Sequence, residues 1–140
     1  MKLTSLILAF GLMFGTSHAL NAQTASQMDA ATAAIELATA ICAKTPLDCA
    51  AAVEAAVAAM DAAGISGAAL DGVLGQLAGA LTEIGAQLPP AVQVQIAAAM
   101  DVVLTKLSPN APQRQAIMEI SAALASGTGA TITATIPSPT

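Results

Sequence analysis

Residues 70–88 have the sequence LDGVLGQLAGALTEIGAQL, in which a large apolar residue recurs at every third or fourth position. The recurring residues are Leu70, Leu74, Leu77, Leu81, Ile84 and Leu88. Side chains with this spacing lie along one face of an α-helix, because the helix makes one turn in about 3.6 residues. The stretch therefore predicts an amphipathic helix that buries one face.

The same helical spacing occurs in four other segments of the chain. Their apolar residues are Met28, Ala31, Ile35, Ala38 and Cys42; Ala50, Val53, Val57 and Met60; Val92, Ile96, Met100, Val103 and Leu107; and Ile117, Ile120 and Leu124. Proline or glycine interrupts the pattern at Thr45-Pro46, Ser66-Gly67, Pro89-Pro90 and Asn110-Ala111-Pro112. We therefore expect an all-α fold, a small bundle or short array of about five antiparallel, alanine-rich helices within residues 20–126.

Residue types at the breaks indicate where these helices begin and end. Thr45, which precedes Pro46, is expected to cap the second helix, and Asn110 with Gln113 has the spacing of a capping box. Glycines stand where three helices are expected to stop, at Gly64, Gly85 and Gly127.

A motif of three residues occurs in two of the segments. Ala59-Met60-Asp61 recurs forty residues later as Ala99-Met100-Asp101. Because the match is short and the sequence is rich in alanine, we interpret it as a chance match, and the alternative is an array of repeated helical units.

The N-terminus has the three parts of a secretory signal peptide. Lys2 supplies the positive charge, residues 6–14 lack polar side chains, and Ser17-His18-Ala19 places small residues at the −3 and −1 positions. We expect residues 1–19 to be removed by cleavage after Ala19, with Ala22 as the alternative site, and the protein to be secreted to the periplasm or the extracellular medium. An uncleaved anchor is the other interpretation, although the apolar run is shorter than the roughly 20 residues that span a membrane.

Removal of residues 1–19 changes the inventory of reactive side chains. Both phenylalanines and the single histidine lie in this segment, and the chain has no Tyr or Trp, so the remaining 121 residues (140 − 19) contain no aromatic ring. These remaining residues include three basic and nine acidic side chains, which gives a net charge of −6 (3 − 9). This composition excludes histidine-dependent catalytic triads, histidine metal sites and the basic or aromatic surfaces that bind nucleic acid. We expect no metal, no other cofactor and no attraction to anionic membranes.

Cys42 and Cys49 are the two cysteines of the chain, and they flank the predicted turn at Pro46. In an exported protein such a pair predicts a disulfide bond that clamps a helical hairpin. A metal site would need further ligands and a redox pair normally has closer spacing, so the remaining alternative is free or intermolecular thiols.

Two pairs of acidic residues share helix faces, because the members of each pair are seven positions apart. Asp29 pairs with Glu36, and Glu54 pairs with Asp61. Both pairs lie opposite the apolar faces, so we expect them to be solvated rather than to act as catalytic acid–base pairs, which need an apolar or charge-coupled pocket. Weak Ca²⁺ binding is the other interpretation, although no loop has the spacing of an EF-hand.

Gly72, Gly75 and Gly79 lie inside the helix predicted for residues 70–88. Glycine costs about 1 kcal/mol relative to alanine in a helix, so three glycines together indicate close packing of another helix. We expect that helix to belong to the same chain. The alternative is a homotypic or membrane-inserting helix, although Asp71 and Glu83 argue against a membrane span.

Residues 127–140 are rich in Gly, Thr, Ser and Pro and carry no charged side chain. This composition predicts a flexible tail. The tail also contains an alternating pattern typical of a strand that adds to the sheet edge of a partner, formed by Thr131, Ile132, Thr133, Ala134, Thr135 and Ile136.

Together these features predict an exported, non-enzymatic helical component of the cell envelope or extracellular matrix that acts through protein–protein interaction. The expected partner is a second copy of the chain or another exported protein. The alternative is a secreted helical protein that binds lipid and acts on membranes. An enzyme that depends on carboxylates alone is a third interpretation.

Overall fold

The part of the chain that the structure describes is built of helices. The computed structural model describes residues 25–129, so the predicted signal peptide and the predicted strand at Thr131–Ile136 lie outside the described residues. Five α-helices and a short 3-10 helix follow one another: α2 (Ala25–Lys44), η1 (Pro46–Asp48), α3 (Cys49–Ala62), α4 (Gly67–Gln87), α5 (Pro90–Lys106) and α6 (Arg114–Ala125). The all-α class predicted from the apolar spacing is confirmed.

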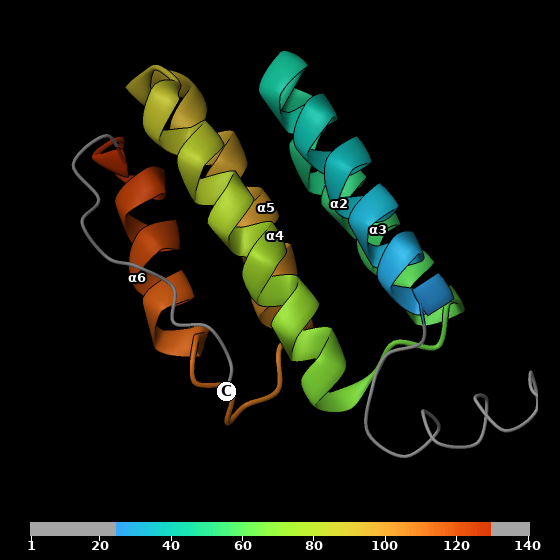
Figure 1. Ribbon diagram of the computed structural model, residues 1–140. Helices are drawn as coiled ribbons and strands as arrows, with labels where there is room; N and C mark the ends of the chain where they lie inside the picture. The colour runs from blue at the N-terminus through green and yellow to red at the C-terminus, as the bar shows by residue number, and fades with distance from the viewer. Residues whose placement is uncertain (1–24, 130–140) are drawn as a thin grey trace, which may run out of the picture.

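Consecutive helices run in opposite directions, so the chain passes up and down the molecule (Figure 1). α2 packs against α3, α3 against α5, α5 against α4, and α4 back against α2. These four helices therefore surround a shared core, and α6 packs along α5 with a smaller contact to α4. Within this bundle α3 and α5 are neighbours that run in the same direction, because α4 lies between them in the chain.

Two helices end at left-handed glycines, as the sequence predicts for Gly64 and Gly127. Gly64 has φ +80° and Gly127 has φ +74°, a backbone conformation that glycine adopts without a steric penalty. After Gly64 the Ile65 amide donates to the Met60 carbonyl at 3.1 Å. At the end of α6 the Thr128 amide donates in the same way to the Ala123 carbonyl at 2.9 Å. Both ends are Schellman motifs, which satisfy carbonyl groups in the last helical turn.

Two predicted side-chain caps are wrong, although a helical segment does begin at Pro46, directly after Thr45. The Thr45 side chain does not cap α3, because its hydroxyl donates to the Ile41 carbonyl at 3.1 Å and so closes the end of α2. Asn110 and Gln113 form no capping box, because α6 begins at Arg114 and the Gln113 side chain instead turns inward to α4. Both polar residues satisfy the backbone of a neighbouring element rather than the start of the next helix.

The core consists of aliphatic and thioether side chains. The fully buried large apolar side chains include Val53, Met60, Leu74, Leu77, Leu81, Ile96, Met100, Val103, Ile117, Ile120 and Leu124, and all of these lie on the predicted apolar faces. The prediction is wrong at Met28, which is 54% exposed. The buried face of α2 consists instead of Ala31, Ala34, Ala38 and Cys42, so α2 meets its neighbours through small side chains.

Gly85 is a close-packing glycine of α4 rather than the predicted helix stop. α4 continues to Gln87, and Gly85 is buried inside it. A Cβ atom on Gly85 would lie 2.6 Å from Cδ2 of Leu124 on α6 and 3.4 Å from Cγ2 of Ile96 on α5. The absence of a side chain therefore lets α4 approach both of these helices.

The three glycines predicted to pack closely differ from one another. Gly75 is buried, and a Cβ atom there would lie 3.4 Å from Nε2 of Gln113. Gly72 is half-buried. The prediction is wrong for Gly79, because a Cβ atom there would meet no atom of a neighbouring segment within 4 Å.

Residues 127–129 are bound to the bundle, although the sequence places them in the tail. The Gly129 amide donates to Oε1 of Gln93 at 2.9 Å, and Nε2 of Gln93 donates to the Leu88 carbonyl at 3.1 Å. Gln93 is fully buried. Its two hydrogen bonds therefore tie the end of the described chain to the turn between α4 and α5.

Candidate functional site

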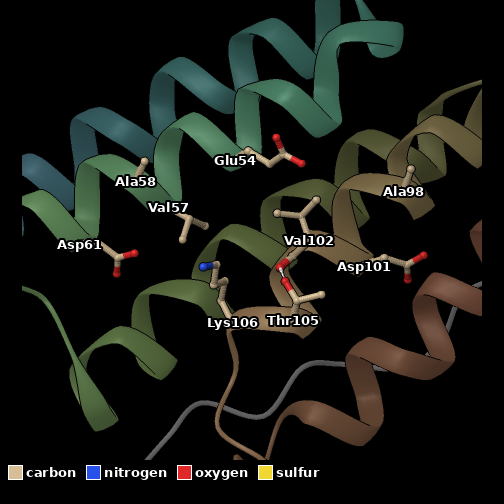
Figure 2. Close-up of a pocket in the computed structure, with 9 residues that line it drawn as sticks. All are labelled: Glu54, Val57, Ala58, Asp61, Ala98, Asp101, Val102, Thr105 and Lys106. Carbon is tan, nitrogen blue, oxygen red and sulfur yellow. Dashed lines mark hydrogen bonds between the residues drawn. The ribbon is translucent and has the colours of Figure 1, made fainter.

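A groove lies between α3 and α5, the two neighbouring helices that run in the same direction (Figure 2). Its volume is about 470 Å³, which is within the range of about 300–1,000 Å³ found for ligand pockets. α3 contributes Glu54, Val57, Ala58 and Asp61, and α5 contributes Ala98, Asp101, Val102, Thr105 and Lys106. The groove is partly open to solvent, intermediate between an enclosed cavity and a flat surface.

The spacing of these residues explains why each helix presents one face to the groove. On α3 they stand at positions 54, 57, 58 and 61, and on α5 at positions 98, 101, 102, 105 and 106. The α3 set follows the spacing i, i+3, i+4, i+7 and the α5 set the spacing i, i+3, i+4, i+7, i+8, which keeps side chains on one side of a helix. Because Ala58 and Ala98 are small, they leave open the space that longer side chains on the two faces would fill.

The floor of the groove is apolar. Val57 is buried, Val102 is half-buried, and the methyl groups of Ala58 and Ala98 are exposed to the groove. The hydroxyl of Thr105 donates to the carbonyl of Val102 at 2.7 Å, so this polar group is bound to its own helix. The floor can therefore bury apolar surface of a partner without leaving a threonine hydroxyl unpaired.

Charged side chains surround this floor. Glu54, Asp61, Asp101 and Lys106 are all exposed, and Figure 2 shows Lys106 on the Asp61 side of the groove and Asp101 on the Glu54 side. Three carboxylates and one ammonium group give the rim a net charge of −2 (1 − 3). The rim therefore attracts a cationic partner.

The Asp101 carboxylate is held in place from a third helix. Its Oδ1 accepts a hydrogen bond from Oγ of Ser121 at 2.8 Å, and the same hydroxyl lies 3.3 Å from the Ala97 carbonyl. Ser121 is buried on α6. This hydrogen bond holds the Asp101 carboxylate toward α6, at the margin of the groove, and Figure 2 shows it pointing away from α3.

The carboxylates of the groove are spread along two helices. Within residues 25–129, no three side chains of the His, Cys, Asp and Glu types come together where they could hold a metal ion. The groove instead combines apolar contact with separate negative charges. This combination suits the binding of an elongated surface that is both apolar and cationic.

The first residue of α3 is anchored by a disulfide bond. The structure pairs Cys42 with Cys49, as the sequence predicts, with their Cα atoms 4.4 Å apart and both side chains fully buried. The bond joins the last turn of α2 to the first residue of α3. It therefore constrains the helix that forms one wall of the groove.

Part of this site is predicted by the sequence. Glu54 and Asp61 are expected on a solvated face, and both are exposed, as are Asp29 and Glu36 on α2. The structure brings Glu54 and Asp61 to the groove, whereas Asp29 and Glu36 do not line it. Asp101 is not among the residues that the sequence patterns predict for a site.

The repeated motif is the signal that points to Asp101. In Ala59-Met60-Asp61 and Ala99-Met100-Asp101, both methionines are fully buried and both aspartates line the groove. On each of the two helices the motif therefore places a buried methionine next to an aspartate at the groove. Only the structure shows that these two helices are parallel neighbours.

Comparison with known proteins identifies no relative: no protein-family model, no curated protein and no solved structure matches the chain. Among residues 25–129, no helix combines the length and the apolar character needed to cross a membrane.

Proposed function

We propose that this protein is an exported, non-enzymatic helical component of the cell envelope or extracellular matrix, and that it acts by binding another protein through the groove between α3 and α5. The groove carries the proposal, because it combines an apolar floor with a charged rim. Interfaces between proteins have the same organisation, with apolar contacts at the centre and polar groups around them.

Two independent features support export. Residues 1–19 have the pattern of a secretory signal peptide. The disulfide between Cys42 and Cys49 is typical of oxidising compartments outside the cytosol.

The inventory of side chains supports binding rather than catalysis. The single histidine of the chain lies within residues 1–19, so the exported protein would carry no imidazole to act as a general base near pH 7. The acidic residues at the groove are exposed to water, whereas a catalytic acid–base pair needs an apolar or charge-coupled pocket.

Site-specific photo-crosslinking in the exporting cell tests this function. Ala98 is exposed at one end of the groove, so replacing it with the photoreactive residue p-benzoylphenylalanine places the probe beside a bound partner. We expect irradiation to give one discrete adduct whose second component is a protein, identified by mass spectrometry.

The matched control carries the same photoreactive residue at Ala33, which is exposed on α2 and does not line the groove. We expect no discrete adduct from this position. Lipid adducts from both positions would favour the membrane-active alternative, and the absence of a protein adduct at Ala98 would contradict the proposal.

A further inference from the structure

We infer that the partner bound in this groove is an amphipathic helix of another protein, with small apolar residues on one face and two basic residues about seven positions apart beside them. The inference rests on the proposed function, because it names the chemistry of the partner for the same groove. It follows from the negative charge of the rim and from the spacing of the acidic residues. That the partner is another protein follows because no helix of this chain carries two basic residues at the matching spacing.

The charge of the rim requires a cationic partner. Glu54, Asp61 and Asp101 outnumber Lys106 around an apolar floor. The whole chain has the same sign, with nine acidic and four basic residues. An anionic or strongly acidic partner would therefore be repelled both at a distance and at the groove.

The spacing of the carboxylates fits a helix that lies along the groove. Glu54 and Asp61 are seven residues apart on α3, which corresponds to a rise of about 10.5 Å over two helical turns. Two basic residues seven positions apart on a helix alongside α3 would therefore meet both carboxylates. Asp101 on α5 adds a third negative charge at the margin of the groove, where Ser121 on α6 holds its carboxylate.

The open floor also suits a helix with small apolar residues. Val57 and Val102 lie between the charged residues, and Ala58 and Ala98 leave space above the two helices. Helices that face each other through small side chains approach closely, which increases their contact area. The long stems of lysine or arginine can follow the walls while their charged ends reach the rim.

A second copy of this chain lacks the residues that this partner needs. Residues 20–140 contain three basic residues, which stand at the end of α2 (Lys44), in the groove itself (Lys106) and at the start of α6 (Arg114). Arg114 already donates to the carbonyls of Leu104 and Leu107 at 2.9 and 3.2 Å. Since each lies on a different helix, no helix of a second copy presents two basic residues at the required spacing.

Binding of a designed peptide to the full oxidised protein tests the inference. The probe is a fluorescein-labelled helix of 18 residues, with alanine along one face and two lysines seven positions apart beside that face. We expect saturable binding in the micromolar range by fluorescence anisotropy, and weaker binding as salt is added because the charged rim is exposed. Two control peptides isolate the two features: one replaces both lysines with glutamates, and the other replaces the apolar face with glutamine and serine.

A matched pair of variants locates the binding site. The variant E54Q/D61N/D101N removes three negative charges from the groove, and we expect it to weaken binding of the lysine peptide about tenfold. The control variant D29N/E36Q/E83Q removes three exposed negative charges from α2 and α4, which lie on the other side of the bundle. We expect it to bind almost as tightly as the unchanged protein. Circular dichroism should show equal helix content for all three proteins.

Equal weakening by both triple variants would overturn the inference, since it would mean that the peptide responds only to net charge. Equal binding of the glutamate peptide, or no binding of the lysine peptide, would overturn it as well. These outcomes are separate from failure of the proposed function. A protein adduct at Ala98 together with no peptide binding would keep the groove as an interface and remove the basic helix as its partner.

Discussion

Replacement of Gly85 by alanine is expected to lower the free energy of unfolding by about 1–2 kcal/mol, although alanine is the better helix former. The added methyl group would lie 2.6 Å from Cδ2 of Leu124, so one of the two residues must move. Leu124 is fully buried and also lies against Gly129, which leaves its side chain little room to shift. Urea denaturation of the oxidised protein, followed by circular dichroism, measures the change.

The same substitution two turns earlier provides the matched control. Gly79 lies on α4 with open space around its α-carbon, so Gly79→Ala should raise the free energy of unfolding by about 0.5–1 kcal/mol through helix propensity alone. Opposite signs for Gly85→Ala and Gly79→Ala are the expected result. Stabilisation by both substitutions would show that α4 does not pack against Leu124 as described.

A double-mutant cycle tests the contact itself. Leu124→Ala should destabilise the protein by about 2–5 kcal/mol, because it removes a fully buried side chain. In the Leu124→Ala background, the methyl group of Gly85→Ala has space, so this second substitution should become neutral or stabilising. Additive effects of the two substitutions would contradict direct contact between them.

Loss of the disulfide bond is expected to lower the free energy of unfolding by about 2–3 kcal/mol, because the unfolded chain is no longer constrained across the bridged loop. Cys42 and Cys49 are both fully buried, so the variant C42A/C49A avoids burying polar hydroxyl groups in their place. Urea denaturation of this variant and of the unchanged protein with and without reductant measures the effect. The reduced protein and the variant should have similar midpoints, both below that of the oxidised protein. A midpoint that does not respond to reductant would contradict the structural role of the bond.

The helices and the core were largely predictable because they depend on local signals. Proline at the start of η1 and α5 and left-handed glycines at Gly64 and Gly127 set boundaries that the sequence states directly. The apolar spacing likewise identified the large buried residues of α3 to α6. On α2 the same reasoning selected Met28 as buried, because alanine carries too little apolar signal to show that Ala34 lies on the buried face instead.

The remaining errors concern residues whose role depends on distant parts of the chain. Gly85 reads locally as a helix stop, and only the position of Leu124 on α6 shows why a glycine is needed inside α4. Gln113 reads as a capping residue, yet its amide donates to the Asp71 carbonyl at 2.6 Å, 42 positions away. No local pattern distinguishes these roles from the common ones.

The groove was predictable only in part for the same reason. The seven-residue spacing of Glu54 and Asp61 places them on one face of α3, which the sequence shows. The sequence does not show which helix lies beside α3. In the bundle this neighbour is α5, although α4 comes between α3 and α5 in the chain. The repeated Ala-Met-Asp motif was the available sequence signal, and its meaning depends on that arrangement.

Methyl NMR of the oxidised protein, titrated with the two-lysine peptide, tests most directly whether the surface between α3 and α5 is the binding site. The methyl signals of Val57, Val102, Ala58 and Ala98 should move together as the peptide saturates the groove. The signal of Leu37, which is 66% exposed on α2, should stay in place and serves as the internal control. Shifts at Leu37 with unchanged signals from Val57 and Val102 would contradict the account.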